Sequence, residues 1–149
     1  MESGTFAWSR DTPWAMSQEK LEIARRALAA VSGGDPEAGQ PFFDPSIEWD
    51  MSGVPEWPEK SIYRGAEVAE FLRLWADSWR DWHFDVTDIR EAAGDRVFAA
   101  IHEWGIGTES KVGVDQHRYL VCTVRSGHIT RVEMFSDREE ALEAARLSK

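Results

Sequence analysis

Hydrophobic residues recur at two different spacings along the chain, and the change of spacing divides it into two parts. Before Trp82, apolar positions lie three or four residues apart, which predicts amphipathic helices. We expect one helix from its N-cap Ser17 to Gly33-Gly34, a short second helix from Asp35 that ends before Pro41, and a third over 66–81. The third carries a broad apolar stripe that continues to Trp82 and must be covered in the folded protein.

Beyond Trp82 the apolar positions alternate with polar ones, which predicts strands. Four strands are expected over 83–91, 96–105, 112–125 and 129–136, in addition to a short one over 47–51. The turns between the four are short, so neighbouring strands pair antiparallel. A last helix follows from Asp137. Helices grouped ahead of a run of strands predict an α+β fold rather than a doubly wound sheet.

Two segments fall outside this pattern. Residues 52–65 hold two prolines and two glycines, which predicts a loop, and its Trp57 and Tyr63 favour a partly ordered flap. Residues 1–16 are polar, contain Trp8 and Trp14, and are expected to form an N-terminal arm. The remaining residues, 17–149, are expected to form a single domain.

Composition and charge exclude several functions. The net charge of -10 argues against a nucleic-acid binder and against an anionic membrane surface, because both require basic side chains. The chain has no secretory signal pattern and no apolar run long enough to span a bilayer, so a cytoplasmic protein is expected. The single cysteine, Cys122, excludes an internal disulfide and a cysteine-based zinc cluster.

Tryptophan is the most unusual component, with eight in 149 residues. Indoles on an amphipathic helix are more often core than ligand site, but small-molecule pockets are also largely aromatic. We expect a pocket lined by aromatic side chains from the first strand, the third helix and the later strands, namely Trp49, Tyr63, Phe71, Trp75, Trp79, Trp104, Tyr119 and Phe135. A flat or alicyclic ligand would suit it.

Four titratable side chains are candidates for acid–base catalysis. His102 and His117 can exchange a proton near neutral pH, and Asp50 can act as a base if it is buried among indoles. Glu133 is either a pocket acid or half of a cross-strand ion pair with an arginine such as Arg118. Each histidine can equally be an ordinary sheet residue. Glu103 lies on the face of its strand opposite His102, and which face points inward stays open.

Three phrases in this order of elements carry a family resemblance. They are GDRV at 94–97, the turn Ser126-Gly127-His128-Ile129, and MFSDREEALEAA at 134–145. Together they resemble the nuclear transport factor 2-like superfamily, and its SnoaL-like, polyketide cyclase-like branch above all, over roughly residues 17–147. The resemblance implies a cone-shaped, curved, mixed or antiparallel sheet wrapped around a long helix, with a pocket at the open end. It also implies a homodimer formed through the sheet.

The resemblance leaves the reaction open. The catalytic base of ketosteroid-isomerase-like members follows the first strand, and here a shift of one residue places either Trp49 or Asp50 at that position. The leading hypothesis is a cofactor-independent isomerase, cyclase or dehydratase acting on a small hydrophobic molecule. Non-catalytic ligand binding and a dimeric interaction protein are the alternatives. The four histidines show no metal-binding spacing, so no metal is expected.

Overall fold

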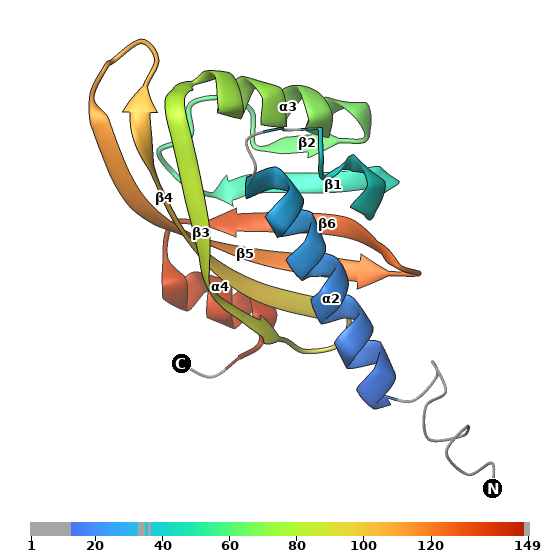
Figure 1. The fold of residues 1–149 in the computed structure, drawn as a ribbon. Coiled ribbons are helices and arrows are strands. Elements are labelled where there is room, and N and C mark those ends of the chain that lie inside the picture. Colours follow the sequence, from blue (N-terminus) through green and yellow to red (C-terminus); the bar gives the residue numbers. More distant parts are fainter. Residues whose placement is uncertain (1–12, 33–34, 36, 148–149) are drawn as a thin grey trace, which may run out of the picture.

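Six strands form one curved, open sheet in the computed structural model, which describes residues 13–32, 35 and 37–147 (Figure 1). The strand order is β2-β1-β6-β5-β4-β3. The elements are α2 (Pro13–Ser32), η1 (Gln40–Phe42), β1 (Phe43–Gly53), β2 (Ile62–Arg64), α3 (Ala66–Asp77), β3 (Trp79–Glu91), β4 (Arg96–Gly107), β5 (Gly113–Arg125), β6 (His128–Phe135) and α4 (Arg138–Ala145). The expected α+β fold with a curved mixed sheet is confirmed.

The four strands β3 to β6 pair antiparallel in sequence order, as their short turns predict. Ser126 and Gly127, between β5 and β6, both have positive φ, which is the backbone of a tight two-residue hairpin turn. The first strand, β1, lies beside the last, β6, and the two run parallel. The sheet is therefore mixed, and residues far apart in sequence meet along the β1–β6 seam.

The strand β1 is longer than expected, and the strand β2 was not expected. β1 begins at Phe43, ahead of the expected start at 47. Within the expected loop over 52–65, residues Ile62–Arg64 form β2, which pairs antiparallel with β1. Backbone pairing with β1 thus makes a strand of residues that show no alternation of apolar and polar positions.

The helices differ from the pattern at three places. α3 ends at Asp77, and Trp79 already belongs to β3, because the spacing of Trp75, Trp79 and Trp82 imitates a helical stripe across the boundary. The expected second helix is only the short turn η1, in which Pro41 contributes no backbone N–H. α2 begins at Pro13, before Ser17, and the part of the expected arm up to residue 12 lies outside the described residues.

Helices cover both faces of the sheet. α2 and α3 pack over the face that carries Trp49, Ile101 and Leu120, which we call the inner face. α4 packs over the opposite, outer face against Phe98 and Val121. Across the described residues, none of the helices has the length and apolar character needed to cross a membrane.

A buried lysine fixes α2 to the turn between β3 and β4. The Nζ of Lys20 donates hydrogen bonds to the carbonyl oxygens of Ala92, at 2.9 Å, and of Gly94, at 2.6 Å. Burial lowers the pKa of Lys20, because the charged form loses hydration. This contact links α2 to the turn at one end of β3 and β4.

Candidate functional site

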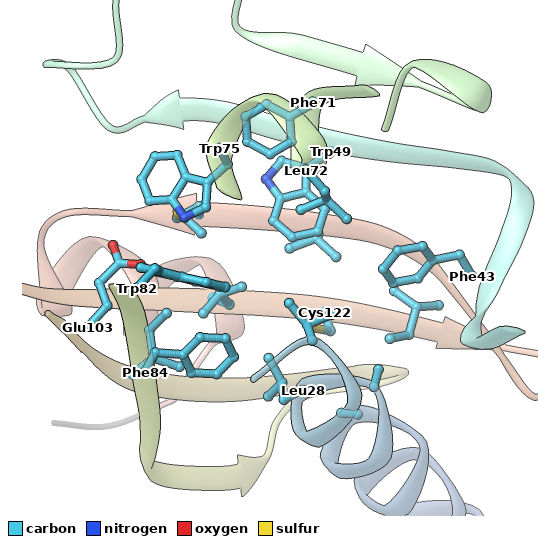
Figure 2. Close-up of a pocket in the computed structure, with 18 residues that line it drawn as sticks. Leu28, Phe43, Trp49, Phe71, Leu72, Trp75, Trp82, Phe84, Glu103 and Cys122 are labelled. Atoms are coloured by element: carbon cyan, nitrogen blue, oxygen red, sulfur yellow. The ribbon is translucent and has the colours of Figure 1, made fainter. Parts of the chain in front are cut away.

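A cavity lies between the inner face of the sheet and the two helices α2 and α3 (Figure 2). Its volume is about 60 Å³, so the cavity is narrow. Its lining comes from both helices and five strands: Ala24, Ala27, Leu28, Val31, Phe43, Trp49, Phe71, Leu72, Trp75, Trp82, Phe84, Ile101, Glu103, Leu120, Cys122, Ile129, Val132 and Met134.

Helical spacing brings the two helices to the cavity. The four lining residues of α2 recur at positions i, i+3, i+4 and i+7 from Ala24, which places them on one stripe. Phe71, Leu72 and Trp75 form the corresponding stripe of α3. Figure 2 shows the α3 side chains above the cavity and Leu28 of α2 below it. Because Ala24 and Ala27 are small, space remains between α2 and the aromatic side chains opposite.

Aromatic rings form most of the wall. The rings of Trp49 and Phe71 lie 5.5 Å apart, those of Phe71 and Trp75 6.5 Å apart, and those of Trp82 and Phe84 5.2 Å apart. Contacts of this kind add to the free energy gained by burying the rings. The wall is therefore largely apolar and aromatic.

A bulge in β3 turns Trp82 toward the cavity. The pairing of β3 with β4 shifts register between Arg80 and His83, and Asp81 there has a positive φ of 70°. The bulge is crowded, because a Cβ atom on Gly105 would lie 2.9 Å from the Asp81 carbonyl oxygen. Glycine at 105 thus permits the bulge that aims the indole of Trp82 inward.

Glu103 is the only charged residue among the described residues of the cavity wall, and it is 1% exposed. Its Oε2 accepts a hydrogen bond from Trp82 Nε1 at 3.0 Å, and its Oε1 accepts one from Gln116 Nε2 at 2.8 Å. Burial raises the pKa of the Glu103 carboxyl, although these hydrogen bonds and the charge of Arg118 oppose the shift. A carboxylate whose pKa is raised is a stronger base than an ordinary carboxylate.

Polar side chains continue from Glu103 toward the loop that follows β1. Arg118 Nη2 donates to Gln116 Oε1 at 3.1 Å and lies 2.7 Å from Glu56 Oε2. The Ser136 hydroxyl donates to Glu56 at 3.1 Å. Partial burial acts against it, but a backbone hydrogen bond, Arg118 and Ser136 together lower the pKa of Glu56, so this carboxylate stays charged. We call Glu56, Gln116, Arg118 and Ser136 the polar end.

The loop over 54–61 packs against α3 beside the polar end. The Trp57 ring lies 5.5 Å from the Phe71 ring and 5.5 Å from the Trp75 ring. Trp57 Nε1 also donates a hydrogen bond to the Tyr63 hydroxyl at 3.2 Å. The loop therefore rests directly on two side chains of the cavity wall, in the position expected of a flap.

A model of the SnoaL-like domain matches residues 24–132, which is well over half of the chain and includes the whole cavity wall except Met134. The chain belongs to the SnoaL-like family. This result confirms the resemblance found in the sequence. No functionally curated protein matches the sequence.

Solved structures of other proteins share this fold. TerC, crystallised with polyporic acid, is 20% identical with a TM-score of 0.68 over 84% of this chain and 98% of its own. An NTF2-like protein from Burkholderia thailandensis is 25% identical, with a TM-score of 0.68 over 87% and 98%. A ketosteroid isomerase-like protein from Catenulispora acidiphila, in complex with trimethylamine, is 16% identical, with a TM-score of 0.65 over 85% and 94%.

Three of the aromatic residues expected in the pocket of this SnoaL-like chain line the cavity, namely Trp49, Phe71 and Trp75. Tyr63 is buried behind the wall, with its ring 4.5 Å from that of Phe71. Trp79 neighbours Trp75 at 6.1 Å but is not part of the lining. Trp82, which the sequence placed on the helical stripe alone, completes the aromatic wall from β3.

Three others lie on the outer face, contrary to the expected placement. Tyr119 and Phe135 pack against the cluster under α4. Trp104 stacks on His102 at 4.9 Å and on His83 at 5.6 Å. The reason is strand parity: Glu103 and Leu120 face the cavity, so their neighbours in sequence face away from it.

The four catalytic candidates also lie on the outer face, and none of them lines the cavity. Asp50 and Glu133 flank Arg131, at 2.9 Å and 3.7 Å, so Glu133 contacts this arginine rather than Arg118. His102 and His117 stack on each other at 4.9 Å. In the described part of the chain, no group of three or more potential ligands is arranged to hold a metal ion.

His102 also contacts the carboxylate of Asp115, which is largely exposed, at 2.7 Å. The histidines and the indole pocket are thus separate features on opposite faces of one sheet. Sequence reasoning missed Glu103 as a candidate, although it continues the apolar face of Val97, Ala99 and Ile101. A carboxylate on an otherwise apolar strand face is the signal that could have identified it.

The single cysteine lines the cavity but is chemically inert. Burial raises the pKa of the Cys122 thiol to about 12, since no charged group compensates the lost hydration of the thiolate. The thiol therefore stays protonated near neutral pH and is a poor nucleophile. Cys122 acts as an apolar wall residue, as its position in the run YLVCTV indicates.

Proposed function

We propose that this protein binds a small, largely apolar molecule in the aromatic cavity and that Glu103 transfers a proton within it. The observation that carries the proposal is one buried carboxyl group on a wall that is otherwise apolar. Such a site offers burial to a hydrophobic skeleton and a single point of polar chemistry to one reacting atom. The reaction class is cofactor-independent acid–base catalysis, such as an isomerisation.

The carboxyl group supplies the proton transfer in this reaction. The Glu103 carboxylate removes a proton from a carbon next to a carbonyl, and the electron pair of that C–H bond moves onto the carbonyl oxygen as an enolate. The protonated carboxyl then returns the proton to the same carbon or to another carbon of the conjugated system. The raised pKa of Glu103 supports both steps, because it reduces the difference in acidity between the Glu103 carboxyl group and the C–H group of the substrate.

The comparisons support small-molecule binding in general terms. TerC was crystallised with polyporic acid and the Catenulispora acidiphila protein with trimethylamine. These ligands belong to those proteins. They are consistent with a fold that is used to enclose small organic molecules.

Deuterium exchange into 2-tetralone tests the proposal. The ketone has acidic protons beside its carbonyl and a bicyclic apolar skeleton, and its exchange in D₂O is followed by NMR. We expect the protein to accelerate exchange and Glu103→Gln to abolish the acceleration, because the amide cannot accept a proton. His117→Ala, on the outer face, is the matched control and keeps the wild-type rate. Full acceleration by Glu103→Gln, or its loss in His117→Ala, would contradict the proposal.

Non-catalytic binding is the second candidate, and a specific observation favours it. Both carboxylate oxygens of Glu103 already accept hydrogen bonds, from Trp82 and Gln116. A carboxylate held in this way can orient a ligand without reacting with it. Under this alternative, 2-tetralone binds to the protein but its exchange is not accelerated. The homodimer implied by the family resemblance stays a prediction.

A further inference from the structure

Arg118 is a buried cation with unused hydrogen-bonding capacity at the polar end. It lies on the inner face of β5, two residues from Leu120 of the cavity wall, and its side chain is only 9% exposed. Its Nε is buried without a hydrogen-bond partner among the described residues. Its Nη2 contacts both Gln116 and Glu56. Its Nη1 donates only a long hydrogen bond, of 3.4 Å, to the His117 carbonyl oxygen.

A guanidinium group binds a carboxylate best through two parallel N–H donors. Arg118 uses this mode with none of its described partners, because Glu56 contacts Nη2 alone. A buried donor that has lost its water without gaining a partner is unfavourable. A second carboxylate that engaged Nε together with Nη2 would remove that cost.

Glu56 is a partner that can be exchanged. It belongs to the loop over 54–61 rather than to a strand, and its side chain is 55% exposed. Replacing its carboxylate at Arg118 by another leaves the local charge unchanged. The displaced Glu56 returns to water, where its carboxylate is well hydrated.

The polar end is also connected to the proposed reaction centre. Gln116 donates to Glu103 through Nε2 and accepts from Arg118 through Oε1, so one amide side chain joins the carboxyl of the cavity to the guanidinium. A molecule that reached from the aromatic wall to Arg118 would therefore pass close to Glu103. The Glu103 carboxyl and the Arg118 guanidinium would then each contact a different polar group of that molecule.

We propose that the ligand of this cavity is a small aromatic or alicyclic carboxylic acid whose carboxylate binds Arg118 in place of Glu56. This inference rests on the proposed function, because it requires that the cavity bind a ligand. It narrows the substrate class from an apolar molecule to an apolar molecule with one anionic group. Glu56 then acts as an internal competitor that closes the loop over the polar end.

Calorimetric titration with 2-naphthoate and with 2-naphthamide tests the inference, because the two probes share one ring system and differ in charge. We expect the wild-type protein to bind the carboxylate at least about tenfold more tightly than the amide, as a charge-assisted contact would provide. Arg118→Gln is expected to remove this preference and to leave binding of the amide unchanged. Equal affinities for the two probes in the wild type would overturn the inference.

Glu56→Gln gives an independent test in an exposed side chain whose replacement does not threaten folding. Removing the competitor is expected to tighten binding of 2-naphthoate several-fold and to leave 2-naphthamide unaffected. Arg125→Gln, an exposed arginine on the outer side of the same strand, is the matched control and keeps the wild-type preference. Weaker binding of 2-naphthoate by Glu56→Gln would overturn the role of Glu56. If neither probe binds the wild type, the proposed function itself fails.

Discussion

Glu103 combines two properties that oppose each other. It is buried in an apolar wall, which raises its pKa, and it accepts hydrogen bonds from Trp82 and Gln116, which favour the charged form. Burial is the larger effect, so the folded protein binds a proton at Glu103 more tightly than the unfolded chain does. This difference makes the stability of the protein depend on pH in a predictable direction.

Glu103→Gln should therefore change how stability varies with pH. A carboxyl with a raised pKa contributes stability that is fully present below its unfolded pKa and is lost as pH rises through its folded pKa. The glutamine variant has no such loss. We expect the free energy of unfolding of the variant, minus that of the wild type, to increase from pH 4 to pH 8, by about 1.4 kcal/mol for each unit of the pKa shift.

Urea denaturation at several pH values measures this difference. Carboxyls with lowered pKa that lie away from Glu103, such as Asp95, lower the stability of both proteins equally at low pH and cancel in the subtraction. A difference that stays constant with pH for Glu103→Gln would mean that its pKa is not raised in the folded state.

Strand parity explains why the sequence did not identify Glu103. Both faces of 96–105 carry apolar residues, so alternation alone does not say which one points inward. The observed cavity lies under the face of Ile101 and Glu103, and α4 covers part of the other. The expected catalytic group, His102, was therefore one residue away from the carboxyl that lines the cavity. Only the packing of α2, α3 and α4 decides between the two faces.

At the scale of elements, α2 supplies the floor of the cavity. Leu28 lies half-buried on its cavity stripe, and Ala29 beside it is exposed. Leu28→Trp adds volume to a space that is already narrow, so it should weaken binding of 2-naphthamide by about tenfold or more, at a modest cost in stability. Calorimetric titration measures the affinity.

Ala29→Trp is the matched control, because it adds a larger side chain on the solvent side of the same helix. It should bind the probe with the wild-type affinity. Unchanged binding by Leu28→Trp, or equal losses in both variants, would mean that the probe does not occupy the space above α2.

The boundary between α3 and β3 shows what local pattern can and cannot predict. The sequence identified the helix, its apolar stripe and the strand that follows, because each follows a regular spacing. It extended the helix to 81, since Trp79 and Trp82 continue the helical spacing by coincidence. Pairing of Trp79 with Gly107 and the bulge at Asp81 decide the boundary, and both depend on β4 rather than on local sequence.

At the scale of the whole molecule, one sheet carries two different chemical surfaces. The inner face holds the aromatic cavity and its single carboxyl, while the outer face holds α4, the pairs around Arg131 and the stacked rings of His83, Trp104, His102 and His117. The sequence predicted the fold class and the existence of an indole-rich cavity. The sequence could not predict which polar groups line that cavity, because this depends on tertiary packing.

The indole signals of the protein report directly which face binds a ligand. In a ¹⁵N-labelled sample, each Trp side chain gives one Nε1–H resonance, which can be assigned by Trp→Phe substitution and followed during titration with 2-naphthamide. Trp49, Trp75 and Trp82 line the cavity, whereas Trp104 lies on the outer face. We predict saturable shifts for the first three and an unchanged signal for Trp104. Shifts of Trp104 with unchanged signals from the three cavity indoles would contradict the account.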